Sequence, residues 1–447
     1  MNQSSIPAYR ADYTCVIWHP EAFKILMLES SLPVLTSPES VYSSPYRVHD
    51  QILEQLNLEV RVLRRIGFER DVAANHAWMA FELEFVGDAS NIPTGAKWLS
   101  KKEINQLPLE SQRQLVTKLF TEARDVFALR PIWTQREWWD EILGSIDAWL
   151  KSQNATRTGF SQLKTWQISS LSRIETTVGR LYLKVVPPFF AREPGLTGFL
   201  ASLFPKNMPE VLVVNFEIPW MLMRDFGDLE LSETTPLDQV CAALNSYAKL
   251  QIESLKYIPE LQSLGCQNRG LINLASDIQN LLGDETVLLR DEEDGFTSQQ
   301  ITTLRELEPE FLKRCEIIGK SGIPDMLEHG DLWLNNVNIR DGQAVFYDWT
   351  DGALTFPLLG MPLSEFENDI WDQDTRESLI EAYLEPFTQY QPMNLLKEML
   401  FLVQPLVHLY RAVSYQRFII PGVEDKTEWQ SGCIWSFKSV LKIMNEA

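Results

Sequence analysis

The chain has 447 residues, of which 45% are hydrophobic and 23% charged, and its net charge at pH 7 is −21. This length predicts two or three domains, and the hydrophobic content is typical of a packed globular protein. The negative charge argues against nucleic acid or an anionic membrane surface as partners; it either favours a cationic substrate or serves solubility alone.

The five cysteines are far apart, with no Cys-x-x-Cys pair among them, so the sequence predicts neither a zinc site nor a disulfide framework. The first residues form no apolar signal segment, and no run approaches the roughly 18 apolar residues of a membrane span. We therefore expect a cytoplasmic protein without a membrane partner. The sequence leaves the oligomeric state open.

Residues 1–130 predict a small α/β domain. The expected order is two strands that form a hairpin, a helix with apolar residues four apart, and two further strands, at residues 13–18, 23–28, 45–56, 60–66 and 77–85. Ser100 is followed three residues later by Glu103, which is the spacing of a capping box at the start of a helix.

This order of elements, together with the ending Trp98-Leu99-Ser100 and Glu103, resembles a Nudix domain over about residues 11–110. The resemblance implies a glycine before the helix and several carboxylates along it that hold magnesium. The chain has no glycine before Gly67, and one carboxylate of the expected set remains, which is too few for a metal cluster. We predict a non-catalytic Nudix-like domain; an unrelated small α/β domain is the alternative.

Residues 110–127 and 135–151 predict helices, and we place a linker between domains at 131–154. The second helix carries Trp138 and Trp139 on its apolar side. A stripe of this kind is more often core than a platform for ligands.

From Gly159 the pattern becomes β, with three alternating runs, at 163–168, 173–178 and 181–186, and a turn predicted at Gly179 and Arg180. Lys184 is the single charge in the third run, where an ammonium could reach the α- and β-phosphates of ATP. Glu193 begins the next helix and is placed to pair with it. The alternative for Lys184 is a surface lysine at a strand edge.

The glycine-rich phosphate loop of protein kinases is missing. Residues 169–172 stand between the first two runs instead, and Ser170 among them could contact phosphate. Two more runs, at 209–212 and 220–223, complete a small lobe.

The segment Asp225-Phe226-Gly227, which follows Arg224, spells the magnesium motif of protein kinases, but it stands before His329 instead of after it. We interpret it as a hinge whose backbone groups bind an adenine edge. Met223 would back the adenine pocket.

The residues on which a catalytic interpretation depends are His329-Gly330-Asp331, Asn336 five residues later, and Asp348 twelve residues after that. A kinase-type site needs an aspartate that accepts the proton of a substrate hydroxyl, followed by an Asn and an Asp that hold magnesium. Two short β-prone runs joined by Asp341-Gly342 predict a hairpin, which would return Asp348 to the side of Asn336. The alternative is a solvated Asp and Asn beside an ordinary hairpin.

The remaining sequence predicts a helical lobe, with helices at 236–254, 271–282, 298–321, 375–384, 395–417 and 429–445. We interpret the acidic run 291–294 as a solvated loop. Residues 363–385 hold eight carboxylates that either bind an amine-bearing acceptor or form a solvated face: Glu365, Glu367, Asp369, Asp372, Asp374, Glu377, Glu381 and Glu385.

Taken in this order, the motifs of residues 155–447 resemble the aminoglycoside phosphotransferase family, which also includes choline, homoserine and macrolide kinases. The resemblance implies an α+β protein-kinase-like fold with two lobes, a β-rich N-lobe at 155–228 and a helical C-lobe at 229–447. It also implies ATP and Mg²⁺ as cofactors. The implied roles are base for Asp331, metal ligands for Asn336 and Asp348, phosphate clamp for Lys184, partner of the clamp for Glu193, and a structural brace for His329.

These features predict an ATP- and magnesium-dependent enzyme that phosphorylates a hydroxyl of a small molecule of the aminoglycoside, choline or sugar type. The alternative is a nucleotide-binding pseudokinase or regulatory module, because the missing glycine-rich loop and the degenerate first domain show that this chain tolerates lost motifs. Family resemblance alone does not identify the acceptor.

Overall fold

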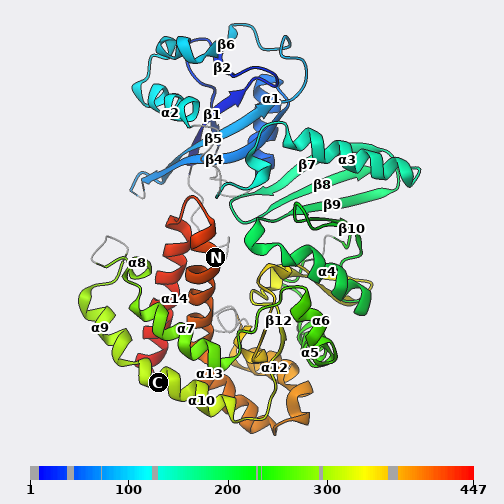
Figure 1. The fold of residues 1–447 in the computed structure, drawn as a ribbon, viewed down its shortest axis with the longest axis vertical. Helices are drawn as coiled ribbons and strands as arrows, with labels where there is room; N and C mark the ends of the chain where they lie inside the picture. Colours follow the sequence, from blue (N-terminus) through cyan, green and yellow to red (C-terminus); the bar gives the residue numbers. More distant parts are fainter. Residues whose placement is uncertain are drawn as a thin grey trace. The chain divides into compact units, whose positions relative to one another are not determined.

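The computed structural model describes residues 10–37, 45–71, 73–122, 129–227, 230–232, 234–290, 295–360 and 371–446. The chain forms two compact units, Met1–Pro187 and Pro188–Ala447, and Figure 1 traces them from blue to red. None of the helices in the described ranges is long and apolar enough to cross a membrane.

The first unit is built on a mixed six-stranded sheet. Its strands are β1 (Arg10–Trp18), β2 (Lys24–Leu28), β3 (Val34–Ser37), β4 (Val60–Asp71), β5 (His76–Phe85) and β6 (Ala96–Ser100). They follow the order β4-β5-β1-β2-β6, with β3 beside β1; β1 is antiparallel to β2 and parallel to β5. The predicted hairpin and the next two strands are confirmed, and β3 and β6 add to them.

Helix α1 (Pro45–Leu56) has the predicted bounds and packs its apolar side on this sheet. Val48 and Ile52 are fully buried, as their four-residue spacing predicts. The capping box is also confirmed, since the Ser100 N–H and hydroxyl both donate to the Glu103 carboxylate, at 3.0 and 2.6 Å. It begins a 3₁₀ helix, Lys101–Gln106, and α2 (Glu110–Thr121) follows. The first unit is thus an α/β structure, and its Nudix-like assignment stays a prediction.

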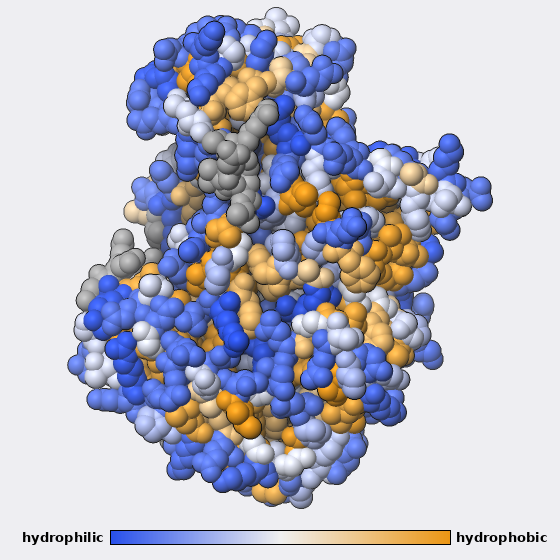
Figure 2. Space-filling model, viewed as in Figure 1, coloured by the Kyte–Doolittle hydropathy of each residue, from blue (hydrophilic) through white to orange (hydrophobic). Residues whose placement is uncertain are grey.

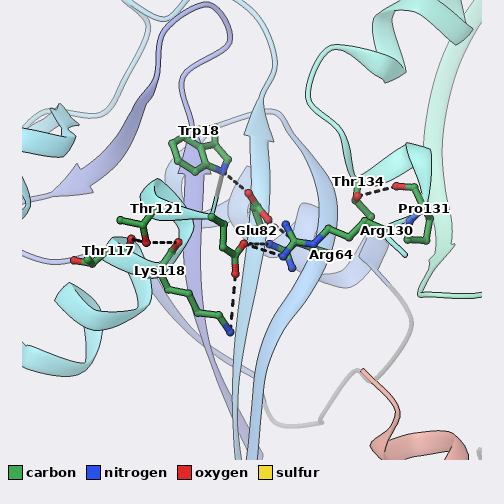
Figure 3. Close-up of polar contacts among 10 residues, drawn as sticks. Trp18, Arg64, Glu82, Thr117, Lys118, Thr121, Arg130, Pro131 and Thr134 are labelled. Carbon is green, nitrogen blue, oxygen red and sulfur yellow. Dashed lines mark hydrogen bonds and ion pairs between the residues drawn. The ribbon is translucent and has the colours of Figure 1, made fainter. Parts of the chain in front are cut away.

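A network of charged side chains ties the segment after α2 to the sheet (Figure 3). The Glu82 carboxylate accepts from Trp18 Nε1 at 2.7 Å and from Arg64 Nε at 2.6 Å. Arg64 and Arg130 both donate to Glu122 Oε2, at 3.0 and 2.9 Å. The Arg64 and Glu82 side chains are only 16% and 12% exposed, so solvent screens this network weakly.

Helix α3 (Trp138–Ser152) is part of the same unit. Trp138 and Trp139 are buried, which confirms the prediction that the tryptophan stripe is core. Trp139 Nε1 also donates to the Trp133 carbonyl at 3.0 Å, and this bond satisfies the polar end of the buried ring.

The β-rich part of the first unit is the antiparallel set β7 (Arg157–Thr165), β8 (Ser170–Thr176) and β9 (Gly179–Val185). Three strands exist as predicted, but β7 and β8 begin before their predicted starts at 163 and 173, and the predicted turn at Gly179 and Arg180 is wrong. Thr176 pairs with Gly179, so the chain reverses at Thr177 and Val178, and Gly179 begins β9 with φ +112°, a conformation open to glycine. The Gln162 side chain of β7 exchanges two hydrogen bonds with the Val62 backbone of β4, at 2.8 and 2.9 Å.

The second unit is mainly helical, with small antiparallel strand pairs. The pairs are β10 (Val211–Asn215) with β11 (Trp220–Arg224), β12 (Met326–Glu328) with β15 (Ala353–Thr355), and β13 (Val337–Arg340) with β14 (Gln343–Phe346). Its helices are α4 (Arg192–Leu203), α5 (Leu237–Ser254), α6 (Ile258–Ser263), α7 (Leu271–Gly283), α8 (Glu285–Leu288), α9 (Ser298–Glu306), α10 (Glu308–Gly319), α12 (Gln373–Leu384), α13 (Met393–Ser414) and α14 (Thr427–Glu446).

Most of these helices match their predicted ranges, but the single helix predicted at 298–321 is wrong. It is divided into α9 and α10 at Leu307. Pro309 stands in the first turn of α10, where its missing N–H costs nothing, whereas inside a continuous helix it would remove a hydrogen bond and clash with the preceding turn.

One continuous hydrophobic core runs through the helices of the second unit. Helix α13 packs along α14 and α5 packs along α12, and α13 continues into a π-helix, Tyr415–Ile419. On the face of this unit drawn in Figure 2 hydrophilic residues prevail, with smaller hydrophobic areas between them. The strand pairs β12–β15 and β13–β14 carry the predicted site.

Candidate active site

The hairpin β13–β14 places Asn336 and Asp348 at the same end of one structure. Val337 pairs with Phe346, and the turn residues Asp341 and Gly342 have φ +52° and +75°, as the Asp-Gly signal predicts for a type I′ turn. The ladder extends one step further, because the Tyr347 N–H donates to the Asn336 carbonyl at 3.1 Å. Asp348 therefore follows directly after the residue that is hydrogen-bonded to Asn336.

The loop that carries Asp331 leaves β12 through Gly330. This glycine has φ +82°, and a Cβ on it would lie 2.7 Å from Asp351 Cβ and 2.8 Å from the Asp351 carbonyl oxygen, so no other residue fits without a shift. Asn336 Nδ2 donates to the Asp331 carbonyl at 2.8 Å, and the Trp333 N–H does so at 3.0 Å. The predicted base and the predicted metal ligand Asn336 are thus joined by a direct hydrogen bond.

The two oxygens of the Asp331 carboxylate have different surroundings. Oδ1 accepts from Trp333 Nε1 at 2.6 Å and lies 3.5 Å from Arg411 Nη2, and the Arg411 guanidinium stacks 4.7 Å above the Trp333 ring. Within the part of the chain that the structure describes, Oδ2 makes no hydrogen bond. The side chain is 44% exposed, so Oδ2 is the oxygen that can receive a proton from a bound molecule. The sequence reasoning missed Arg411, which lies 80 residues away in α13.

His329 lies beneath this loop, fully buried. Its Nε2 is 2.8 Å from the Tyr347 carbonyl, so Nε2 carries the proton and donates it to that oxygen. The imidazole packs against the Trp349 ring, with 4.7 Å between the two ring centroids. The ring therefore links the Asp331 loop to the strand end that carries Asp348.

Asp348 has a left-handed backbone, with φ +67°, which turns the chain sharply after β14. Its carboxylate and that of Glu193 in α4 contact the same hydroxyl, Thr350 Oγ1; the contact to Glu193 Oε2 is 3.1 Å long. A hydroxyl has one proton to donate, so it serves one carboxylate at a time. Glu193 is fully buried.

The oxygen atoms present suit a magnesium ion. Asn336 donates through its amide nitrogen, which leaves the amide oxygen as the acceptor, and Asp348 adds a carboxylate. Hard cations such as Mg²⁺ prefer such oxygens and complete their shell with phosphate and water. Among the described residues, no cluster of three or more His, Cys, Asp or Glu could hold a metal without such additions.

Two arginines oppose the negative charge around Asp351, whose pKa also responds to the carboxylates of Asp331, the predicted base, and Asp348, a predicted metal ligand. Burial and then the Asp331 carboxylate raise the pKa of Asp351 to about 6, while Arg192 and Arg269 oppose the shift. Arg192 also donates to the Thr350 carbonyl at 2.7 Å and to the Gly352 carbonyl at 3.2 Å. Its bonds hold the chain directly after Asp348.

Lys184 and Ser170 belong to the first unit, and their predicted roles stay predictions. Lys184 lies in β9 opposite Leu171 of β8 and is 6% exposed. The predicted loop at 169–172 is wrong, because Ser170 already begins β8 and is 1% exposed. The chain turns at 166–169, where Trp166 Nε1 donates to Ser169 Oγ at 2.9 Å.

The predicted hinge begins at the end of β11, where Met223 is buried. The Arg224 N–H donates to the Glu210 carbonyl at 2.9 Å, and the Gly227 N–H donates to Asp225 Oδ1 at 3.0 Å. These two N–H groups therefore have partners inside the protein, and an adenine contact at this segment stays a prediction.

The end of the hinge segment is attached to the central hairpin. The Gly227 carbonyl accepts from Asn338 Nδ2, and the Phe226 ring lies 5.0 Å from the Tyr347 ring. The segment predicted to hold adenine and the hairpin predicted to hold magnesium thus form one structure.

The acidic segment is described from Trp371 onward, so Glu365, Glu367 and Asp369 and the acidic run 291–294 lie outside the described residues. Glu377 and Glu381 both pair with Lys397, and Asp372 caps α12 by accepting from the Thr375 N–H at 2.8 Å. These pairings favour the solvated-face alternative for the described part.

Comparisons with known proteins add similarities in structure. No protein-family model and no curated protein matches the sequence. Solved structures that are similar include a choline kinase from Streptococcus pneumoniae, with 11% identity, 69% of this chain and 100% of that chain covered, and a TM-score of 0.49. A choline/ethanolamine kinase family protein from Mesorhizobium loti has 16% identity, with 67% of this chain and 94% of that chain covered and a TM-score of 0.47. A macrolide 2′-phosphotransferase type I has 14% identity, with 66% of this chain and 96% of that chain covered and a TM-score of 0.46. At these values we rest the function on the residues of the site.

Proposed function

We propose that this protein transfers the γ-phosphoryl group of ATP to a hydroxyl of a small molecule. One observation carries the proposal: hydrogen bonds connect Asp331, Asn336 and the residue directly before Asp348, from Asn336 Nδ2 to the Asp331 carbonyl at 2.8 Å and from the Tyr347 N–H to the Asn336 carbonyl at 3.1 Å. These bonds support our assignment of Asp331 as the base and of Asn336 and Asp348 as magnesium ligands, the set of groups that phosphoryl transfer requires.

In the proposed reaction Asp331 Oδ2 accepts the proton of the acceptor hydroxyl as its oxygen attacks the γ-phosphorus. A new P–O bond forms, the bond from the γ-phosphorus to the bridging oxygen breaks, and ADP leaves with the electron pair. Asn336 and Asp348 would hold magnesium, which neutralises phosphate charge when bound. Trp333 and Arg411 contact Oδ1, so Oδ2 is the oxygen that would accept the proton.

Lys184 in β9 and the hinge at Met223 and Arg224 complete the proposal as phosphate and adenine contacts, with Glu193 orienting the lysine. The similar structures are named as a choline kinase, a choline/ethanolamine kinase family protein, a macrolide 2′-phosphotransferase and an aminoglycoside phosphotransferase in a complex with AMP-PNP and hygromycin B. We therefore propose choline, ethanolamine and hygromycin B as the first compounds to test here, followed by sugars.

The test measures ADP release with MgATP and each acceptor, together with the shift of the melting temperature caused by Mg-AMP-PNP. Asp331→Ala should lower ADP release by about 10³-fold or more and keep the melting shift, because it removes a base and no nucleotide contact. Asp348→Ala should lose both. A ligand at about 100 times its Kd adds roughly 2.7 kcal/mol, which is a shift of several degrees.

Asp341→Asn is the matched control, because Asp341 is an exposed carboxylate in the turn of the same hairpin and Asn also tolerates its left-handed backbone. It should behave as the wild type. Full ADP release in Asp331→Ala would refute the mechanism. A melting shift without ADP release from any acceptor would favour the regulatory nucleotide-binding alternative.

A further inference from the structure

Glu328 is a carboxyl group buried directly before the motif, and the proposed reaction does not use it. It is the last residue of β12, immediately ahead of His329, and it is completely inaccessible to solvent. A Cβ on Gly360 would lie 1.7 Å from its Oε1, so the packing leaves room for this carboxyl and little more. Burial of such a group is costly unless hydrogen bonds satisfy it.

The hydrogen bonds of Glu328 lead to the loop that carries Asp331. Its Oε1 accepts from Tyr247 Oη at 2.9 Å and from the Gly330 N–H at 3.3 Å. Tyr247 Oη in turn accepts from the His329 N–H at 2.9 Å. The backbone N–H groups of the two residues before Asp331 therefore both end on Glu328, one directly and one through the tyrosine.

The residues behind Glu328 are buried and hydrogen-bonded to one another. Tyr247 is fully buried in the middle of α5, on the face that packs against α12. Gln251, one turn further along α5, donates to Glu328 Oε2. Tyr383 of α12 completes the set by donating to Gln251 Oε1 at 2.8 Å or to the Pro357 carbonyl at 2.8 Å. Tyr383 belongs to the same polar group, but among the described residues its hydroxyl bonds Gln251 and Pro357 and not the loop of Asp331.

The hydrogen bonds from Tyr247 and Gly330 to Glu328, which we call the brace, can form in either protonation state of the Glu328 carboxyl group. Burial raises the pKa of Glu328 to about 8, against the opposing effect of its hydrogen bonds from Tyr247 and Gly330. Both the acid and the carboxylate keep an acceptor oxygen toward the Gly330 N–H and the Tyr247 hydroxyl.

We propose that Glu328, together with Tyr247, is a positioning residue that holds the backbone at 329–330 and so aims Asp331 at the acceptor hydroxyl. This inference rests on the proposed function. A base acts only within hydrogen-bond reach of the proton it takes, and a displacement of about 1 Å can cost about 10²-fold in rate. Magnesium and ATP contacts come from other residues, so the rate should suffer and nucleotide binding should not.

The experiment compares Glu328→Ala, Glu328→Gln and Tyr247→Phe with Tyr383→Phe as the matched control. Glu328→Ala should lower kcat by about 10- to 100-fold with less than about a threefold change in KM for MgATP. Glu328→Gln should recover most of the rate, because its amide oxygen still accepts from both donors. Tyr247→Phe keeps the direct bond to Gly330 and should have a smaller effect, and Tyr383→Phe should leave kcat unchanged although it also removes a buried hydroxyl.

Hydrogen–deuterium exchange of a peptide covering residues 326–334 tests the brace without activity. Exchange should accelerate in Glu328→Ala and in Tyr247→Phe but not in Tyr383→Phe. Unchanged kcat in Glu328→Ala, or equal kcat losses in Tyr247→Phe and Tyr383→Phe, would overturn the inference. A wild type that neither releases ADP nor binds Mg-AMP-PNP would instead reject the proposed function, and the exchange rates would then decide the brace alone.

Discussion

Replacement of Gly330 by alanine tests the geometry of the Asp331 loop with one added methyl group. Gly330 has φ +82°, and its Cβ would meet backbone and side-chain atoms of Asp351 at 2.7 to 2.8 Å. The neighbouring atoms include a carbonyl oxygen, which cannot rotate away as the end of a flexible side chain could. Both the backbone conformation and the space therefore oppose the substitution.

The magnitude follows from these two effects. A left-handed conformation costs a residue with a Cβ about 1–2 kcal/mol, and an extra methyl group in a filled space typically costs about 1–3 kcal/mol. Gly330→Ala should therefore lower the free energy of unfolding by about 2–5 kcal/mol. Gly342 in the hairpin turn provides the control, because its φ is +75° and nothing lies within 4 Å of the added Cβ. Gly342→Ala should cost only the conformational part.

Thermal unfolding and ADP release measure both consequences. At about 2–4 °C per kcal/mol for a domain of this size, Gly330→Ala should melt several degrees below Gly342→Ala. It should also lose most of its ADP release because relief of the contact with Asp351 displaces Asp331. Equal melting temperatures for the two variants would refute the argument from crowding, and full activity of Gly330→Ala would show that the loop tolerates displacement.

Two further predictions concern charge. Since the pKa of Glu328 rises from its ordinary value of 4.5 to about 8 on folding, the folded protein retains a proton that the unfolded chain loses, and the contribution to stability falls by about 1.4 kcal/mol per pH unit between about pH 5 and 8. Glu328→Gln should flatten the pH dependence by that amount in urea denaturation, and an unchanged slope would contradict the burial argument. In the first unit, Glu82→Ala removes the acceptor of Trp18 Nε1 and of Arg64 Nε, while Arg64 keeps its bond to Glu122, and should cost about 2–4 kcal/mol. Glu82→Gln should cost less in the same thermal unfolding measurement, and equal losses would contradict the role of the hydrogen bonds.

The parts that the sequence predicts well depend on neighbours in the chain. The Asp341-Gly342 turn, α1 and the Ser100 capping box each result from residues within a few positions of one another, so their patterns can be read without knowledge of the fold. The order of the three motif residues is equally local. The hairpin then brings Asp348 beside Asn336 through a turn of known geometry.

Errors arise where several local solutions compete. The predicted start of β7 and the predicted loop before β8 lie too late in the sequence, because apolar and polar residues alternate only weakly at 157–170. The position of β7 depends on distant partners such as Val62, to which the Gln162 side chain is hydrogen-bonded across 100 residues of sequence. The apolar spacing of 298–321 continues through Pro309, and that proline decides the break between α9 and α10. Periodicity identifies apolar faces, but a proline can interrupt a helix without disturbing the spacing.

The aim of Asp331 could not be predicted, because the groups that set it come from distant helices. Trp333 is two residues away, but Arg411 comes from α13 and Tyr247 from α5. Neither helix carries a signal for these roles, since an arginine or tyrosine on a helix face usually serves solubility or packing. In the proposed reaction the motif supplies the reacting groups, whereas the core of the second unit supplies their orientation. A chain can therefore keep His329, Asp331, Asn336 and Asp348 and still lose activity through a substitution at Glu328.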